Sequence, residues 1–367
     1  MDNLDYGSVV LLTLTYMDAI INAGARILIV KLSAMGDVVH TFPVIRAIKK
    51  TRPDVFIDWV VGDAYLELAQ LSPYADGLIP FKRKEWGRFW NPSAIAQISR
   101  FIGKLREREY AAVLDLQGLL RSGAITGVAR SKHKIGFAYA REGAPLFYNR
   151  KIAAPTGETH AIDRYMKSLE YLGVDSGAGI GYDIAIPQKD IEWAETVLPK
   201  EPFVAVNPNA RWETKRWPIK KFAELIREIE KKKGVRAVIT GGRDEVAASQ
   251  ILASLAGGGV VNLAGTGGFG RLAAILQKAD CLFTNDSGPM HLAVALGTPV
   301  VAVFGPTNPK LTGPYGGNSA AVTPAVDCAP CFKRSCGIGM ECMNSISVDD
   351  VMNAWEKVLT RGGAANG

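Results

Sequence analysis

The chain has 367 residues, a length that favours two domains over a single core, and its 48% hydrophobic and 22% charged residues are typical of a globular protein. A formal net charge of +7 and a pI near 9.1 favour an anionic partner: a phosphorylated sugar, a nucleic acid or an anionic membrane surface. No stretch reaches the roughly 20 apolar residues that a bilayer span requires, so the patterning excludes a helical membrane-spanning protein.

Residues 1–25 are expected to be a leader of unknown role before the first convincing strand. The leader contains the apolar run VVLLTLT, but Asp2 and Asp5 stand where a signal peptide would carry basic residues. An added strand, a disordered leader and a mis-set start codon would each explain it. Without a signal peptide or a membrane span, the protein is predicted to be cytoplasmic.

From Arg26 onward, apolar runs typical of buried strands alternate with segments of helical periodicity. Strands are predicted at 26–31, 55–61, 77–81 and 111–115. Helices are predicted at 37–50, 94–105 and 119–129. This alternation indicates a first α/β domain that covers residues 26–180.

The second half repeats this pattern after a connection at 174–201, which is rich in Gly, Pro and charge and is predicted to hold one short helix. Further strands are predicted at 203–208 and 235–240, with a helix at 218–233 between them. Two parallel strands, at 281–283 and 299–304, flank one short helix. The second domain is predicted to cover 181–345, followed by a C-terminal helix and tail at 346–367.

The predicted fold class is therefore α/β, with two doubly wound, Rossmann-like domains that face each other across a cleft. Sheets of this class bind ligands beyond the carboxyl ends of their strands. The loops that follow predicted strands are consequently the place to look for a site.

Asp37 lies in the first of three strand-end loops that collect polar residues, in the sequence KLSAMGDVVH. Its simplest role is that of a helix N-cap, the commoner function of an aspartate at a helix start. As a carboxylate at the mouth of the predicted cleft, it could instead accept a proton in catalysis.

The other two strand-end loops are suited to an anion. In NPNARWETKRWP, residues 207–218, Lys215 is one of several cations that could neutralise a phosphate. In NDSGPMH, Asp286 or Ser287 can cap a short helix, whose free N–H groups and positive dipole end attract an anion. Gly288 allows close approach to the backbone, and His291 lies about one turn inside the helix. Solvated cations and an ordinary crossover helix are the alternatives.

Basic residues also gather in two parts of the first domain. They include Lys82, Arg83, Lys84 and Arg88, and a second group that begins at Arg121. Solvated loops explain them most simply, and an anionic acceptor or a membrane surface is the functional alternative. No nucleic-acid-binding motif accompanies them, so no nucleic-acid partner is predicted.

Four cysteines lie within fifteen residues, with the spacing Cys328-x2-Cys331-x4-Cys336-x5-Cys342. Such a set could bind zinc or an iron–sulfur cluster, but the spacing matches no standard zinc finger. We expect these cysteines to be structural and dispensable for chemistry, and predict no metal site. Cys281, on a buried strand, is expected to be a core residue.

Several of these motifs resemble glycosyltransferase family 9, and the resemblance runs from Arg26 to about Trp355. The segments that carry it are KLSAMGDVVHTFP, DLQGLLRS, REGAPLFYNRK, THAIDRY, TKRWP, NDSGPMHLAVALGTPVVAVFGPTNP and CAPCFKRSC. The first, the fifth and the sixth are signatures of the whole family.

The resemblance implies a GT-B fold, with the acceptor bound by the first domain and a nucleotide sugar by the second. It implies inverting transfer of heptose from ADP-heptose to a Kdo residue of Kdo-lipid A, with no cofactor and no obligatory metal. A lipid acceptor and basic loops together place the protein at the inner face of the cytoplasmic membrane as a peripheral enzyme. The residues predicted to contact the acceptor are Lys82, Arg83, Lys84, Arg88 and Arg121.

By the same resemblance, Asp37 corresponds to the general base, which reverses the preference for a simple cap. Lys215 corresponds to the lysine that binds the donor diphosphate. The other predicted donor contacts are Asn209, Asp286, Ser287, Gly288 and His291. The loop that carries Asn209 departs from the family's usual pattern.

Two alternatives stay open on the sequence. One is another family 9 transferase, such as the enzyme that adds the second heptose or one that uses a different sugar. The other is a non-catalytic nucleotide-sugar-binding protein on the same scaffold.

Overall fold

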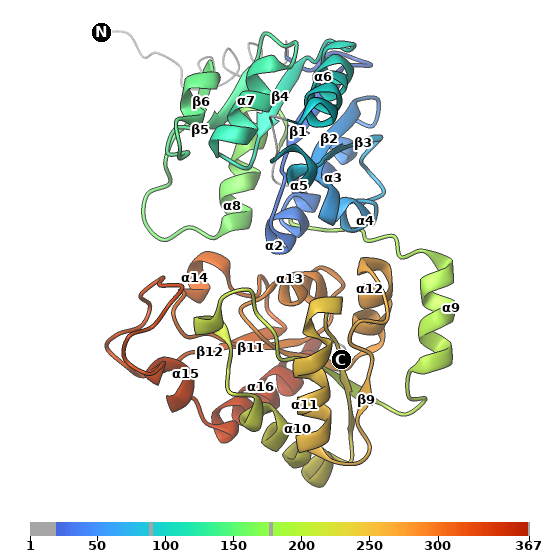
Figure 1. Cartoon of the computed structure of the whole chain (residues 1–367), viewed down its shortest axis with the longest axis vertical. Coiled ribbons are helices and arrows are strands. Elements are labelled where there is room, and N and C mark those ends of the chain that lie inside the picture. Colours follow the sequence, from blue (N-terminus) through green and yellow to red (C-terminus); the bar gives the residue numbers. More distant parts are fainter. Residues whose placement is uncertain (1–19, 88–90, 176–178, 366–367) are drawn as a thin grey trace, which may run out of the picture. The chain divides into compact units, whose positions relative to one another are not determined.

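A computed structural model of the chain describes residues 20–87, 91–175 and 179–365 (Figure 1). The chain divides into two structural units, Met1–Asp183 and Ile184–Gly367. The division falls within a few residues of the predicted domain boundary. Each unit is an α/β domain built on one parallel sheet.

The first unit contains a six-stranded sheet in the order β3-β2-β1-β4-β5-β6. Its strands are β1 (Arg26–Val30), β2 (Phe56–Gly62), β3 (Gly77–Phe81), β4 (Ala112–Asp115), β5 (Lys134–Phe137) and β6 (Arg150–Ile152). All neighbouring pairs are parallel. The four predicted strands of this half are confirmed, and β5 and β6 extend the sheet beyond them.

Helices flank this sheet on both faces (Figure 1). They are α2 (Met35–Val39), α3 (Phe42–Thr51), α4 (Leu66–Ala69), α5 (Arg83–Trp86), α6 (Pro92–Arg106), α7 (Leu120–Val128) and α8 (Ala161–Met166). Short 3-10 turns complete the unit: η1 (Asp63–Tyr65), η2 (Ala144–Phe147) and η3 (Lys167–Leu172). The cover is complete enough that Ile27 to Val30 of the central strand are fully buried.

The single helix predicted at 37–50 is wrong, because the structure has two helices there, α2 and α3. Pro43 stands in the first turn of α3. A proline has no N–H to donate and its ring clashes with the carbonyl four residues earlier, so a continuous helix breaks just before it. The break leaves Asp37 on a separate short helix at the end of β1.

The second unit repeats the architecture with the sheet order β12-β11-β10-β7-β8-β9, again with all pairs parallel. Its strands are β7 (Phe203–Asn207), β8 (Arg236–Ile239), β9 (Val261–Asn262), β10 (Cys281–Asn285), β11 (Val300–Val303) and β12 (Ser319–Val322). Its helices are α9 (Gln188–Val197), α10 (Ile219–Lys233), α11 (Val246–Ala256), α12 (Phe269–Lys278), α13 (Gly288–Ala295), α14 (Pro309–Thr312), α15 (Glu341–Ser345) and α16 (Val348–Ala365), with 3-10 turns η5 (Glu213–Lys215) and η6 (Arg243–Glu245).

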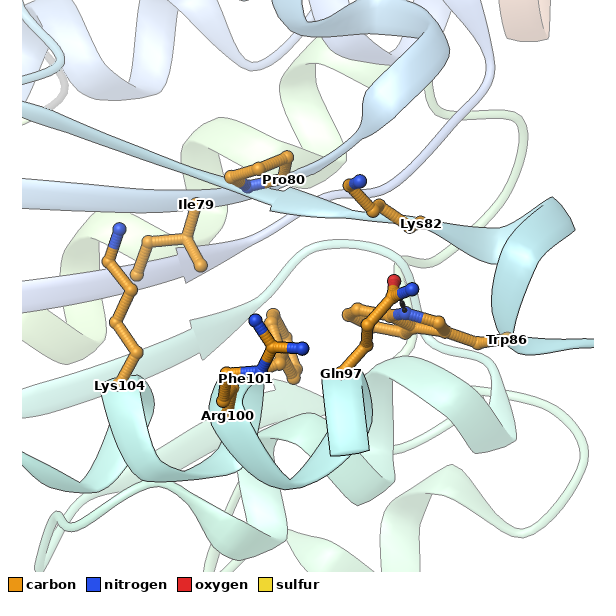
Figure 2. A pocket seen from close by; sticks show the side chains of 8 residues that line it. All are labelled: Ile79, Pro80, Lys82, Trp86, Gln97, Arg100, Phe101 and Lys104. Carbon is orange, nitrogen blue, oxygen red and sulfur yellow. Dashed lines mark hydrogen bonds between the residues drawn. The ribbon is translucent and has the colours of Figure 1, made fainter. Parts of the chain in front are cut away.

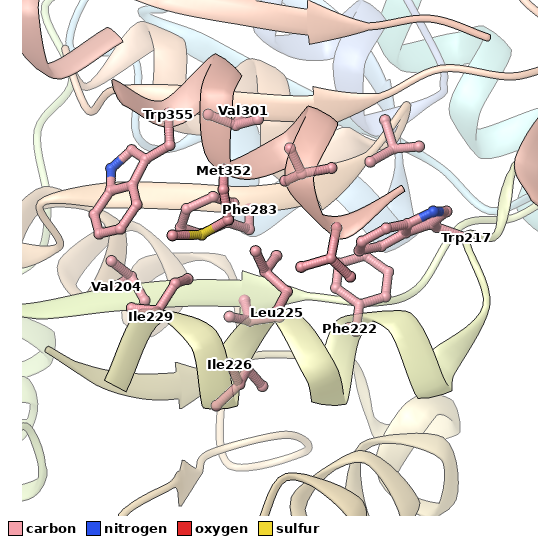
Figure 3. Close-up of a cluster of buried hydrophobic side chains, with 14 of the residues drawn as sticks. Val204, Trp217, Phe222, Leu225, Ile226, Ile229, Phe283, Val301, Met352 and Trp355 are labelled. Atoms are coloured by element: carbon pink, nitrogen blue, oxygen red, sulfur yellow. The ribbon is translucent and has the colours of Figure 1, made fainter. Parts of the chain in front are cut away.

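The core of the second unit forms where α10 and α16 pack on one face of the sheet (Figure 3). The ring of Trp355 on α16 meets Phe283 of β10 edge to face, with centroids 5.4 Å apart. Trp217 and Phe222 make a second edge-to-face pair at 5.0 Å. The predicted C-terminal helix is therefore α16, and it is an integral part of this core.

The described end of the leader packs on the first unit. Ile20 and Ile21 are buried, and the Arg52 guanidinium donates to the Ile21 carbonyl at 2.6 Å. The Gly24 N–H donates to the Asp54 carboxylate at 3.0 Å. The rest of the predicted leader, residues 1–19, lies outside the described residues.

In both sheets the strand order reverses its direction at the same place, between the two central strands. The two central strands are β1 and β4 in the first sheet and β7 and β10 in the second. Open parallel sheets bind ligands at such switch points, beyond the carboxyl ends of the strands. The fold thus directs attention to the loops after these four strands. No helix in the described ranges is long and apolar enough to cross a membrane.

Candidate functional site

Lys31, the residue that follows β1, anchors the first polar cluster. Its side chain is only 2% exposed, and its ammonium meets three oxygens. It donates to the Leu116 carbonyl at 2.9 Å and to the Tyr165 hydroxyl at 2.6 Å, and lies 3.3 Å from Asp37 Oδ1. Three acceptors match the three N–H bonds of an ammonium group, which is the condition for burying a charge.

Asp37 uses both carboxylate oxygens in this cluster. Oδ1 accepts from the Tyr165 hydroxyl at 2.6 Å, and Oδ2 accepts from the Ala34 N–H at 3.0 Å. Ala34 is the N-cap residue of α2, so the predicted N-cap position of Asp37 is wrong: Asp37 lies in the first turn and holds the N-terminus by accepting from the Ala34 amide. Its side chain stays 38% exposed. Since a carboxylate oxygen can accept about two hydrogen bonds, Oδ2 retains the capacity to accept a further proton donor.

The pKa values of this cluster are coupled. Burial alone would raise the pKa of Asp37, but the Lys31 charge, the Tyr165 hydroxyl and the Ala34 N–H outweigh it and lower that pKa below its ordinary value. Burial lowers the pKa of Lys31, against the attraction of Asp37. Asp37 is therefore an ionised carboxylate at neutral pH, the form that a proton acceptor requires.

Asp115, at the end of β4, is a carboxylate of a different kind. It is fully buried, and its oxygens accept from the Tyr148 hydroxyl at 2.6 Å and from the Gln117 and Gly118 N–H groups at 2.8 and 3.0 Å. Burial raises the pKa of this carboxyl above its ordinary value. These contacts make Asp115 a structural residue that shapes the turn after β4, and leave Asp37 as the stronger candidate base.

Gln117 links this turn to the neighbouring loop. Its side-chain oxygen accepts from the backbone N–H groups of Leu32 and Ser33, at 3.0 and 2.9 Å. The loops after β1 and β4 are therefore held together at the switch point of the first sheet.

In the second unit, Asn285 at the end of β10 holds the loop that follows β7. Its side chain donates to the Pro208 carbonyl at 2.7 Å and accepts from the Trp217 N–H at 3.0 Å. Both ends of the loop 208–217 are thus fastened to one residue of the adjacent strand. The loop carries Lys215 to the switch point of the second sheet.

Lys215 and Asp286 form an ion pair at this point, with Nζ 2.5 Å from Oδ2. Asp286 is buried and also accepts from the Thr307 hydroxyl at 2.6 Å. The Lys215 ammonium lies 4.7 Å from the centre of the Trp212 ring. The pair fixes the direction of a cation that keeps N–H bonds for a further anion.

The helix α13 begins directly after this pair. Ser287 occupies its N-cap position and Gly288 its first residue, but no side chain caps the first turn. The Ser287 hydroxyl lies instead 3.0 Å from Thr284 Oγ1, so Ser287 holds the predicted N-cap position without a capping hydrogen bond from its side chain. His291 is buried one turn further along the helix.

Asn209 adds a polar atom that points to a bound group. The residue is 7% exposed, and its backbone N–H donates to Asn207 Oδ1 at 3.2 Å. Its side-chain nitrogen is buried with no hydrogen-bond partner among the described residues, and a Cβ on Gly241 would lie only 3.2 Å from it. A buried donor of this kind normally has a partner, which a ligand or a water molecule would supply.

The predicted acceptor residues do not form one cluster in the structure. Lys82 follows β3 at the edge of the sheet and lines a cavity of about 410 Å³ with Arg100 and Lys104 of α6 (Figure 2). Arg83 and Lys84 are exposed on α5. Arg121 is exposed at the start of α7, beyond β4, with β2 and β1 between the two places in the strand order. Arg88 lies outside the described residues.

Sequence reasoning missed the residues that support these side chains. Lys31 and Tyr165 set the charge state of Asp37, and Asn285 and Thr307 position Lys215 and Asp286. A lysine that closes an otherwise apolar strand is a signal that could have identified Lys31. Tyr165 comes from a segment far along the chain, and its pairing with Asp37 is visible only after folding.

Two doubly wound sheets of the same strand order, each with a polar cluster at its switch point, define the class of two-domain α/β enzymes to which GT-B glycosyltransferases belong. The sequence profile of glycosyltransferase family 9 (heptosyltransferase) matches residues 98–340. The chain therefore belongs to glycosyltransferase family 9 and is an enzyme of that family.

Individual relatives agree with this assignment. Lipopolysaccharide heptosyltransferase 1 of Pseudomonas aeruginosa is 30% identical over 320 residues, covering 85% of this chain and 87% of that protein. The Salmonella typhimurium protein of the same name is 32% identical over 302 residues, covering 81% and 93%. The structure of E. coli heptosyltransferase WaaC with ADP is similar with a TM-score of 0.75 at 28% identity, over 91% of this chain and 99% of that one. The predicted GT-B fold class is confirmed.

The Lys31–Tyr165–Asp37 cluster predicts the effect of removing one hydroxyl. In a Tyr165→Phe variant, Asp37 loses a hydrogen bond to its charged form, so its pKa should rise toward the ordinary aspartate value. A ¹³C-NMR titration of labelled aspartate carboxyls, with Asp37→Asn for assignment, measures this shift. Tyr148→Phe, which removes the equivalent hydroxyl from Asp115, should leave the Asp37 titration unchanged. Equal Asp37 titrations in wild type and Tyr165→Phe would contradict the prediction.

Proposed function

We propose that the chain transfers heptose from ADP-heptose to a Kdo residue of Kdo-lipid A, with inversion at the anomeric carbon and without a metal. The observation that carries the proposal is the Asp37 carboxylate, held ionised by Lys31 and Tyr165 while Oδ2 keeps the capacity to accept a proton. Similar proteins are named lipopolysaccharide heptosyltransferase 1, which supports heptose as the transferred sugar and lipopolysaccharide synthesis as the pathway. The similarity to the structure of E. coli heptosyltransferase WaaC with ADP supports ADP as the nucleotide of the donor.

In the proposed mechanism, Asp37 accepts the proton of the acceptor hydroxyl as that oxygen attacks the anomeric carbon. The bond from the anomeric carbon to the ADP oxygen breaks on the opposite side, which inverts the centre. Lys215 and the N-terminal amides of α13 stabilise the negative charge that ADP carries away. Inversion requires the base and the leaving-group cation on opposite sides of the carbon.

The nucleotide site is proposed to use the loops after β7 and β10. Lys215 contacts the diphosphate as a cation oriented by Asp286 and Trp212. Asn209 offers its unpartnered side-chain N–H to the same ligand. Ser287, Gly288 and His291 complete the donor contacts at the start of α13.

The acceptor assay tests this function directly. Purified protein is incubated with ADP-heptose and either Kdo-lipid A or its mono-heptosylated product, and the products are analysed by mass spectrometry. We expect addition of one heptose to Kdo-lipid A. Turnover of the mono-heptosylated acceptor alone would identify the second-heptose enzyme, and ADP-heptose binding without transfer to any acceptor would identify a binding protein.

An Asp37→Asn variant separates catalysis from helix capping. The asparagine side-chain oxygen can still accept from the Ala34 N–H but cannot take up the hydroxyl proton, so the turnover number should fall by roughly 10²–10⁴ while ADP affinity holds. Asp63→Asn is the matched control, because Asp63 also lies in the first turn of a short helix after a strand, and its side chain accepts from the Ala64 N–H at 2.9 Å. That variant should keep normal turnover. Near-normal turnover of Asp37→Asn would remove Asp37 from the role of base.

A Lys215→Ala variant tests the leaving-group cation. The loss of one charge-assisted contact should weaken ADP-heptose binding about ten- to a hundred-fold, and slow transfer, while thermal unfolding confirms an intact fold. Lys220→Ala, an exposed lysine on the adjacent helix α10, serves as the control and should leave both unchanged. Equal ADP-heptose affinity in Lys215→Ala and wild type would exclude Lys215 from the donor site.

We further propose that the enzyme works in the cytoplasm, at the inner face of the cytoplasmic membrane, as a peripheral protein. Exposed cations such as Arg83, Lys84 and Arg121 support this, since each adds roughly 1 kcal/mol of attraction to an anionic surface at low salt. Binding to phosphatidylglycerol-containing vesicles should exceed binding to neutral phosphatidylcholine vesicles, and should weaken as salt is added. Vesicle binding that is insensitive to salt would point to another means of attachment.

A further inference from the structure

Ser249 is a buried polar residue that the proposed reaction does not use. It lies on α11, the helix that follows β8, and it is fully buried. Its hydroxyl oxygen has no hydrogen-bond partner among the described residues. A serine inside a helix commonly bonds the carbonyl four residues earlier, as the Ser254 hydroxyl does by donating to the Gln250 carbonyl at 3.0 Å. Ser249 therefore requires a partner from elsewhere.

The Ser249 hydroxyl and the Asn209 amide nitrogen meet beside Gly241, the second residue after β8. A Cβ on Gly241 would lie 3.1 Å from Ser249 Oγ and 3.2 Å from Asn209 Nδ2, with the Ala264 methyl group 3.3 Å away. Two buried polar atoms without described partners thus flank one point, although they come from α11 and from the loop after β7. Because residue 241 is a glycine, no side chain of its own occupies that point.

Contacts between neighbouring strand ends hold the backbone around this point. The Asn207 side chain accepts from the Asn209 N–H at 3.2 Å and donates to the Thr240 carbonyl at 3.2 Å. The Gly265 N–H donates to the Gly241 carbonyl at 2.9 Å. The end of β8 is therefore fastened to the loop after β7 on one side and to the loop after β9 on the other.

We propose that one water molecule is bound between Asn209 Nδ2 and Ser249 Oγ, and that Ser249 is a positioning residue for Asn209. Both atoms lie within 3.2 Å of the same point, so a single water can contact both at hydrogen-bond distance. The water accepts one N–H of the Asn209 amide and donates to the Ser249 hydroxyl oxygen. Both buried atoms then have a partner.

The water fixes the direction of the Asn209 side chain, which belongs to the same loop as Lys215. An amide nitrogen has two N–H bonds, so Asn209 keeps the second for the nucleotide sugar. A side chain already held in one rotamer loses less entropy when the donor binds. Ser249 thus contributes to donor affinity without touching the donor, and this step rests on the proposed donor site.

A high-resolution crystal structure of the full chain tests the water directly. We expect a density peak at about 2.6–3.2 Å from both Asn209 Nδ2 and Ser249 Oγ. A Gly241→Ala variant should lack the peak, because its methyl group would lie 3.1 and 3.2 Å from those two atoms. A well-ordered wild-type map without the peak would overturn the proposal, whatever the variant shows.

Calorimetric titration with ADP tests the positioning role. Ser249→Ala should weaken ADP binding about three- to ten-fold, the effect of one neutral hydrogen bond. The matched control is Ser254→Ala on the same helix, whose hydroxyl already has a partner, and this variant should bind ADP normally. In an Asn209→Ala background, Ser249→Ala should have no further effect, because it acts only through Asn209.

The double-variant cycle separates positioning from a general effect on the fold. Additive losses of ADP affinity in the two variants, or a Ser249→Ala affinity equal to that of wild type, would overturn the positioning role. Wild-type protein that does not bind ADP would instead contradict the proposed function, and the crystal structure would still decide whether the water is present.

Discussion

The parallel arrangement of both sheets is the constraint on which the rest of the structure depends. When every strand runs in the same direction, all carboxyl ends meet at one edge, and the loops that leave them are neighbours regardless of their separation in the chain. Asn285 and the loop 208–217 are joined in this way across β10 and β7. Gln117 and Leu32 are joined across β4 and β1. Because both sheets are parallel, each has one polar cluster at the edge where its carboxyl ends meet.

The first cluster shows how a fold can assign two roles to one carboxylate. Asp37 secures the Ala34 amide at the start of α2 and yet keeps an ionised side chain that is 38% exposed. The stabilisation has a chemical cost, because a carboxylate with a lowered pKa is a weaker base. The benefit is that Asp37 remains in the proton-accepting form over a wide range of pH. The choice between cap and base, which the residues alone left open, is therefore not exclusive.

The second cluster is built around a cation that is held rather than mobile. Lys215 is oriented by a buried carboxylate, by an aromatic ring and by a loop fastened at both ends to Asn285. Such preorganisation is what electrostatic stabilisation of a leaving group requires, since a flexible lysine would lose entropy at the moment of reaction. The coil between β12 and α15 extends the same support outward through its contacts with Thr214 and Trp212.

The sequence by itself determined the elements and the loops. Apolar runs and helical periodicity located β1 to β4, β7, β8, β10 and β11 to within a few residues, because burial on both faces of a parallel sheet leaves an unmistakable local pattern. Asp37, Lys215 and Asp286 were found because they lie in the loops that follow such strands. Only the tertiary structure decided what those side chains contact: Tyr165 lies 128 residues from Asp37 and Asp286 lies 71 from Lys215. Charge state and direction are set by partners that folding brings together, and no local pattern in the chain records them.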